Sequence, residues 1–224
     1  MKVQIYTMQT PDEAIAAAQI GVDHIGVTPS NCGLPGEISH AAARAIFEAL
    51  PEGVTKVALS VDNDLDAIEA MARAVQPDIV HLCGPRGAVP PDAVRTLRER
   101  LPGVQIMQAI SVAGPEALDD ARSYHAVADY LLLDTQAPDI GGIGASGATH
   151  DWNISRAIVA ESPIPVILAG GLSPENVAEA IRAVRPWGVD SLTHTNRPLP
   201  EGGFRKDLDR VRAFVAAAKQ VVLA

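Results

Sequence analysis

The chain has 224 residues, of which 47% are hydrophobic and only 4% aromatic, and its formal net charge is −9. This length suits one domain spanning residues 1–224, and the negative charge disfavours binding to nucleic acid or to an anionic membrane. No apolar run reaches the roughly 18 residues of a membrane span, and the N-terminus has no secretory signal. Cys32 and Cys83 form neither a disulfide framework nor a zinc motif. We therefore expect a cytoplasmic monomer or homodimer that acts on a small molecule.

Short strand-like runs alternate with longer helical runs eight times along the chain. In order, the predicted strands are 3–8, 24–28, 56–61, 79–83, 105–111, 130–135, 165–169 and 189–194. The predicted helices are 11–19, 40–50, 65–75, 91–101, 116–127, 153–160, 174–184 and 208–221. Most of the strand runs are continuously apolar, which is typical of parallel strands that are buried on both faces.

Helix boundaries support this division. Thr10-Pro11 and Ser173-Pro174 each place a capping hydroxyl before a proline that can start a helix. Eight βα units in this order predict an α/β fold of the (β/α)8 TIM-barrel class, with a doubly wound open sheet as the alternative. Barrel active sites lie at the carboxyl ends of the strands, so the polar residues there are the candidates.

Asp134 is the first catalytic candidate, because it ends the apolar run Tyr130-Leu131-Leu132-Leu133. Apolar surroundings should raise its pKa and suit it to general acid or base work. The alternative is a carboxylate that caps the amides of the next loop. His81 and His194 lie at two other strand ends, and one of them is expected to be the second catalytic group because imidazole titrates near neutrality.

Binding residues are predicted at the remaining strand ends. Gly170 and Gly171 precede a helix start, so their backbone N–H groups are expected to hold a phosphate, unless they only form a tight turn. Thr195 and Asn196 are expected to add side-chain donors to that phosphate. The predicted substrate-binding residues are Tyr6, Cys83, Gln108, Gly144 and Thr193.

Neither a metal nor a cofactor is expected. His81, Cys83, Asp134 and His194 could in principle surround a divalent metal, but their spacing matches no dedicated metal motif. Gly144 belongs to a glycine-rich loop, 140–149, that is expected to form a lid or a pocket wall.

Several segments together resemble the phosphoribosylanthranilate isomerase family. They are Leu132-Leu133-Asp134-Thr135, Gly141-Gly142-Ile143-Gly144, Leu168-Ala169-Gly170-Gly171-Leu172, Gly188-Val189-Asp190 and Lys206-Asp207. The resemblance covers nearly the whole chain and implies a TIM barrel that catalyses an Amadori rearrangement, an aldose-to-ketose proton shuttle, without metal or cofactor. It also implies that Asp134 is the general acid and that Gly170 and Gly171 form half of the phosphate site.

The chain departs from this family at three functional places. Tyr6 stands where the family has its catalytic base, a cysteine, and a neutral phenol is a poor base at pH 7. The segment 30–35 replaces a Ser-Pro-Arg stretch whose arginine holds the anthranilate, and 192–196 replaces a Ser-Ser-Gly phosphate loop. We therefore expect a cofactor-free isomerase of a sugar-like, phosphorylated substrate that is smaller and more polar than the family's own.

Three alternatives stay open. The first is the family's own reaction in a rebuilt site. The second is a metal-dependent epimerase or lyase on the same barrel. The third is a ligand-binding paralogue without catalytic activity.

Overall fold

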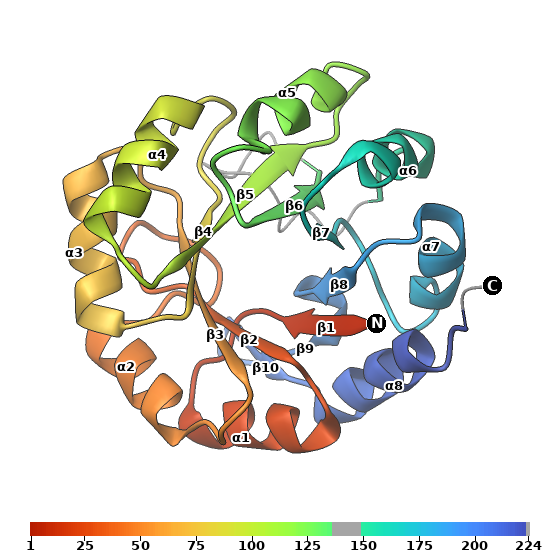
Figure 1. Cartoon of the computed structure of the whole chain (residues 1–224). Coiled ribbons are helices and arrows are strands. Elements are labelled where there is room, and N and C mark those ends of the chain that lie inside the picture. Colours follow the sequence, from red (N-terminus) through yellow and green to blue (C-terminus); the bar gives the residue numbers. More distant parts are fainter. Residues whose placement is uncertain (136–148, 223–224) are drawn as a thin grey trace.

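The computed structural model describes residues 1–135 and 149–222 and shows a closed barrel of eight parallel strands (Figure 1). The strands are β1 (Lys2–Ile5), β2 (His24–Val27), β3 (Thr55–Ser60), β4 (Ile79–Leu82), β5 (Gln105–Ser111), β6 (Tyr130–Asp134), β7 (Val166–Leu168) and β8 (Gly188–Ser191). Each strand pairs with the next, and β8 pairs with β1 through Gln4 opposite Asp190. That closing pair confirms the predicted barrel and excludes the open sheet.

Among the described residues, the helices α1 to α8 surround the barrel (Figure 1). They are α1 (Pro11–Ile20), α2 (His40–Ala49), α3 (Leu65–Val75), α4 (Pro91–Arg100), α5 (Ala117–Tyr124), α6 (Trp152–Glu161), α7 (Val177–Val184) and α8 (Leu208–Lys219). The Thr10 hydroxyl caps α1 as predicted, by accepting a hydrogen bond from the Glu13 N–H at 3.3 Å. No helix among the described residues is long and apolar enough to cross a membrane.

The start of α7 differs from the prediction. The helix was expected from residue 174 but begins at Val177. The Asn176 side chain accepts a hydrogen bond from the Ser173 N–H at 2.8 Å, and this turn delays the helix by three residues. The segment 170–176 is therefore a loop between β7 and α7.

The segment after β8 also differs from the prediction. The predicted strand 189–194 ends at Ser191 and is followed by a short 3-10 helix, η1 (Thr193–Thr195). Two antiparallel strands, β9 (Asn196–Pro198) and β10 (Phe204–Lys206), then form a hairpin. This hairpin returns the chain to the barrel mouth before α8 begins.

Strand register decides which side chains face the barrel interior. Leu133, Leu168 and Val189 are ladder partners in adjacent strands and belong to the outer core between sheet and helices. Because side chains alternate along a strand, the next residue of each strand faces inward. Asp134, Ala169 and Asp190 therefore form one inward row across β6, β7 and β8.

Candidate active site

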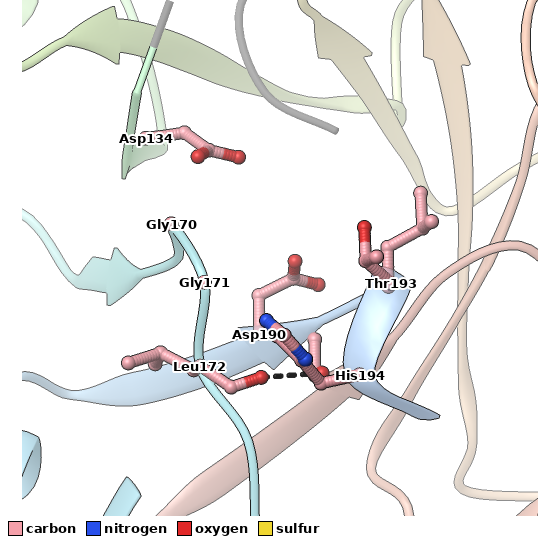
Figure 2. Close-up of a pocket in the computed structure, with 9 residues that line it drawn as sticks. Asp134, Gly170, Gly171, Leu172, Asp190, Thr193 and His194 are labelled. Carbon is pink, nitrogen blue, oxygen red and sulfur yellow. Dashed lines mark hydrogen bonds between the residues drawn. The ribbon is translucent and has the colours of Figure 1, made fainter. Parts of the chain in front are cut away.

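A pocket opens where β6, β7 and β8 end (Figure 2). Loops after β7 and β8 form its sides, and two inward-facing carboxyl groups reach into it. Its lining residues are Asp134, Gly170, Gly171, Leu172, Asp190, Ser191, Leu192, Thr193 and His194. The carboxyl ends of β6, β7 and β8 thus meet at one pocket.

Asp134 lies in this pocket as predicted. Burial raises the pKa of its carboxyl to about 7, although a hydrogen bond from the Thr135 N–H at 2.6 Å opposes the rise. The direction of this shift agrees with the expectation from the sequence. The carboxyl also caps the following amide, and the acid–base role of Asp134 stays a prediction.

Asp190 is a second pocket carboxyl that sequence reasoning missed. It is only 7% exposed, and burial, followed by the negative charge of Asp134, raises its pKa to about 8, while Gln4 and Lys206 oppose the rise. The sequence feature that could have revealed it is a carboxylate in the middle of a buried strand, at an inward-facing position.

The loop after β7 is shaped to bring backbone N–H groups to the pocket. Gly170 and Gly171 have positive φ angles of 82° and 63°, and no described residue accepts a hydrogen bond from their N–H groups. A Cβ on Gly170 would lie 2.7 Å from Nδ1 of His150, so only glycine fits there. The amide of Asn176 donates to the Gly171 carbonyl at 3.0 Å and holds the loop in place.

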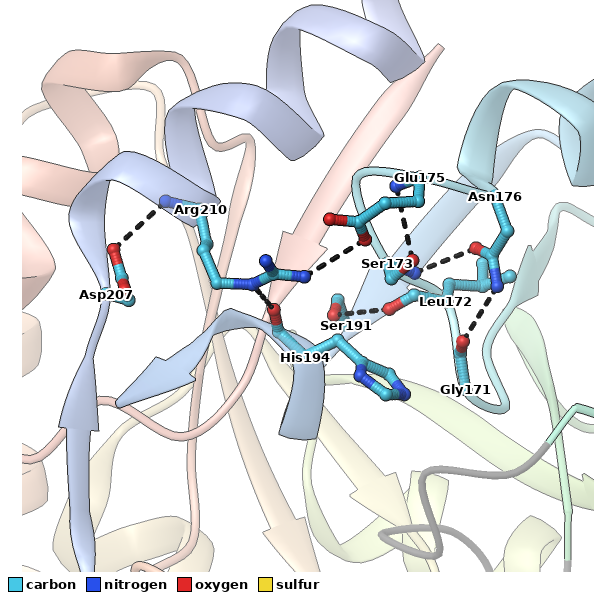
Figure 3. A network of polar contacts seen from close by, with 9 residues as sticks. All are labelled: Gly171, Leu172, Ser173, Glu175, Asn176, Ser191, His194, Asp207 and Arg210. Atoms are coloured by element: carbon cyan, nitrogen blue, oxygen red, sulfur yellow. Dashed lines mark hydrogen bonds and ion pairs between the residues drawn. The ribbon is translucent and has the colours of Figure 1, made fainter. Parts of the chain in front are cut away.

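Arg210 of α8 ties the two loops together (Figure 3). Its Nε donates to the His194 carbonyl at 2.6 Å, and its guanidinium pairs with the Glu175 carboxylate at 3.0 Å. The Ser191 hydroxyl adds a bond to the Leu172 carbonyl at 2.8 Å. These contacts fix the loop after β8, which carries His194, against the glycine loop after β7.

Thr195 and Asn196 do not line the pocket, which contradicts their predicted phosphate role. The Thr195 hydroxyl donates to the Leu192 carbonyl at 2.9 Å. The side-chain amide oxygen of Asn196, Oδ1, accepts a hydrogen bond from Nζ of Lys206. Lys206 is 5% exposed and also donates to the Tyr6 carbonyl. The hairpin therefore uses both residues to hold a buried lysine.

The side chains of Tyr6 and His81 are hydrogen-bonded to each other and do not line the pocket. The Tyr6 hydroxyl lies 2.9 Å from His81 Nδ1, and both side chains are at most 2% exposed. Burial raises the Tyr6 pKa well above its usual value and lowers that of His81 to about 3. A pKa this low does not favour His81 as the second acid–base group, and Tyr6 is enclosed in the barrel interior.

The remaining predicted binding residues also lie away from this pocket, or outside the described residues. Cys83 is buried against Leu59 and Ala109 in the barrel interior. Gln108 faces the other way and lines a cavity beside α4 and α5. Gly144 lies outside the described residues.

The metal alternative needs His81, Cys83, Asp134 and His194 to converge. Asp134 and His194 share the pocket, but His81 and Cys83 do not line it. Over residues 1–135 and 149–222, no group of three or more histidine, cysteine or acidic side chains is placed to hold a metal ion. The described geometry therefore gives the metal alternative no support.

Comparison with known proteins places the chain in a family. The family model described as N-(5′-phosphoribosyl)anthranilate isomerase matches residues 3–217. The chain belongs to this family. An N-(5′-phosphoribosyl)anthranilate isomerase from Methanocella arvoryzae is 38% identical over 96% of both chains. One from Haloferax volcanii is 39% identical over 98% of this chain and 92% of its own.

Solved structures agree. The phosphoribosyl anthranilate isomerase of Thermotoga maritima has a TM-score of 0.82 and 29% identity, over 99% of this chain and 100% of its own. The Thermus thermophilus structure has a TM-score of 0.81 and 26% identity over 98% of each chain. Membership of the phosphoribosylanthranilate isomerase family confirms the expected enzyme class, an intramolecular isomerase of the aldose–ketose type.

Proposed function

We propose that the chain isomerises a phosphorylated, sugar-like aldose to the corresponding ketose, and that the group on C1 of its substrate is smaller than anthranilate. The observation that carries the proposal is the pocket itself, which a carboxyl with a raised pKa, Asp134, lines together with Gly170 and Gly171. In this reaction a proton reaches the ring oxygen as the sugar ring opens, and a proton then moves from C2 to C1.

The phosphate is assigned to the loops after β7 and β8. The Gly170 and Gly171 amides are available as donors, and the N-terminus of α7 follows shortly in the chain, so its dipole favours an anion. Thr193 lines the same pocket and supplies a hydroxyl. With the phosphate there, the sugar carbons extend toward the two carboxyl groups.

Asp134 is proposed as the general acid. Its pKa of about 7 keeps a large share of its carboxyl protonated at neutral pH, so it can deliver a proton to the ring oxygen. The family resemblance independently assigns the same role to this residue. His194, on the opposite loop, is positioned to contact the substrate.

The loop after β2 supports a substrate without an anthranilate carboxylate. It carries no arginine. Its polar groups donate hydrogen bonds to Glu37, an acidic residue of the same loop. The Glu37 carboxylate accepts hydrogen bonds from the Ser30 hydroxyl at 2.9 Å and from the N–H groups of Cys32, Gly33 and Leu34 at 2.9–3.2 Å. A negative substrate group would meet a carboxylate there instead of a cation.

Turnover of defined aldoses tests the proposal. Proton NMR in D₂O would follow ribose 5-phosphate, 5-phosphoribosylamine and N-(5′-phosphoribosyl)anthranilate with the full chain. We expect one of the first two to yield a ketose with deuterium at C1, and the anthranilate compound to be turned over at least tenfold more slowly. Absence of turnover with all three would refute the isomerase proposal.

A second candidate function is isomerisation of N-(5′-phosphoribosyl)anthranilate, the reaction for which the relatives are named. The relatives from Methanocella arvoryzae and Haloferax volcanii, at 38% and 39% identity, favour it. Growth of a tryptophan auxotroph that lacks this isomerase, on expression of the chain, would establish this reaction and reject the smaller substrate. The expected monomer or homodimer and the cytoplasmic location stay predictions.

A further inference from the structure

We propose that Asp190 is the second acid–base group of the site, and that it takes the proton from C2 of the substrate in place of the family's cysteine. This inference rests on the isomerase function proposed above and adds a catalytic residue to it. It accounts for how the chain can catalyse a proton transfer although Tyr6 occupies the position of the family's base.

Geometry is the first support. Asp134 and Asp190 belong to one inward row, and the residue between them, Ala169, is too small to separate them. Figure 2 shows the two carboxyl groups projecting into the same space, beside Gly170 and Gly171. A small substrate whose phosphate sits on the glycine amides would have its first carbons between the two carboxyls.

An unsatisfied atom is the second support. Asp190 is more than nine-tenths buried, yet its Oδ1 has no hydrogen-bond partner among the described residues. Buried carboxylate oxygens are normally hydrogen-bonded, because an unpaired one loses its hydration without compensation. This oxygen is itself enclosed, and its lack of a donor favours uptake of a proton by Asp190.

Charge is the third support. The groups that act electrostatically on Asp190 or share its pocket are Asp134, Lys206, Gln4, Tyr6 and His194. Asp134 and Asp190 repel each other when both are ionised, so the pair retains a proton near neutrality. Lys206 and Gln4 favour the charged form of Asp190, but burial and the charge of Asp134 outweigh them, so the shared proton lies mainly on Asp190 before substrate binds and passes to Asp134 when Asp190 acts as base.

The other potential bases are unsuitable for physical reasons. Tyr6 is neutral, and its hydroxyl is bonded to His81. His81 and Cys83 are buried in the barrel interior and do not line the pocket. Among the described residues, His194 is the competing proton acceptor in the pocket.

The proton transfers balance with these two residues. Protonated Asp134 gives its proton to the ring oxygen while the C1–O ring bond breaks and C1 forms a double bond to its substituent. Ionised Asp190 removes the C2 proton, the C–H electron pair forms a C1–C2 double bond, and the electron pair of the C1 double bond moves onto the substituent. Asp190 returns the proton to C1, and Asp134 accepts the proton from the C2 hydroxyl as the ketone forms. Both carboxyls end as they began, and no external oxidant or reductant is needed.

Paired substitutions test the inference. With the aldose that the wild-type chain converts, we expect Asp190→Asn to lower kcat by about 10²–10⁴-fold, as does Asp134→Asn. Inorganic phosphate should bind Asp190→Asn as tightly as wild type or more tightly, because a negative charge near the anion is removed. Glu99→Gln, an exposed carboxylate in the last turn of α4, is the control and should keep wild-type kcat.

Other outcomes would overturn the inference. Asp190→Asn with kcat within threefold of wild type would do so, as would a collapse of kcat in His194→Gln while Asp190→Asn stays active. A measurement made without substrate distinguishes a failure of this inference from a failure of the proposed isomerase function. Asp134→Asn must lower the pKa of Asp190, read from its carboxyl carbon by NMR, because it removes the neighbouring charge. An unchanged pKa refutes the pairing, whereas a lowered pKa without wild-type turnover refutes only the isomerase function.

Discussion

Asp134 and Asp190 enter one pocket from β6 and β8, at the same level of the barrel, and the charge of Asp134 helps raise the pKa of Asp190 to about 8. Two carboxyls held this way suit proton transfer in both directions, since one can be protonated while the other is ionised. Figure 2 shows that the glycine loop after β7 lies beside them. The proposed function uses the two carboxyls as an acid–base pair and the glycine loop as an anion site.

The glycine loop leads to a prediction with a matched control. Gly170→Ala should weaken binding of inorganic phosphate by at least tenfold, because the new Cβ meets His150 and the φ of 82° is strained. Gly53→Ala has a similar φ of 87° but no atom within 4 Å of the new Cβ. Calorimetry should show a stability loss of about 1 kcal/mol in the control with phosphate binding intact. Equal phosphate affinity in both variants would contradict the assigned phosphate site.

Tyr6 provides a test of which residues are not catalytic. Tyr6→Phe should leave kcat within about threefold of wild type, since the phenol is neutral and does not line the pocket. Loss of its hydrogen bond to His81 should cost about 1 kcal/mol in the free energy of unfolding. Tyr124→Phe, which removes a bond to the Val89 carbonyl at 3.0 Å, is the matched control. A hundredfold fall in kcat for Tyr6→Phe alone would assign the phenol a chemical role.

Lys206 should influence Asp190 through its charge. Lys206→Met removes a cation that favours the ionised form of Asp190, so the acid limb of the pH profile of kcat/KM should move to higher pH. The variant should also lose about 1–3 kcal/mol of stability, because the Tyr6 carbonyl and Asn196 lose a buried donor. A stability loss with an unmoved acid limb would show that Lys206 is only structural.

The stability of the folded chain should depend on pH through the Asp190 carboxyl. The folded-state pKa of Asp190, about 8, exceeds the unfolded value near 4, so the folded chain binds more protons between these values. Wild type therefore loses stability as pH rises through this window, and Asp190→Asn loses less, because Asp134, with a pKa of about 7, still contributes a loss of the same kind. Urea unfolding should show Asp190→Asn gaining more than about 1.4 kcal/mol relative to wild type between pH 5 and pH 8. A constant difference would mean that the carboxyl is already ionised at pH 5.

Periodicity predicted much of the fold, because eight apolar runs separated by helical segments have few ways to pack. Asp134 and Gly170-Gly171 were also predictable, since each follows an apolar run directly. Asp190 was not predicted as a site residue, because the position of a residue near a strand end does not show whether its side chain faces the barrel interior.

Long-range packing decided the remaining residues. Gln108 is one residue out of phase with Met107 and Ala109, which face the interior, so it points toward the helices. Tyr6 is buried because Gly26 of the next strand leaves room for its ring, and a Cβ there would lie 2.3 Å from it. Thr195 and Asn196 turn away because the hairpin returns Lys206 from ten residues further along. For Tyr6 and Asn196 the deciding partners, Gly26 and Lys206, are distant in sequence.

Direct titration of the two carboxyls tests the central claim most closely. Carbon-13 NMR of the Asp134 and Asp190 carboxyl carbons in the full chain, assigned with the two asparagine variants, would follow each group from pH 3 to pH 10. We predict that both titrate above pH 6, near 7 and 8, so that the pair still holds a proton at neutral pH. Titration of both carboxyls below pH 5 would leave two ionised groups at neutrality and would contradict the proposed acid–base pair.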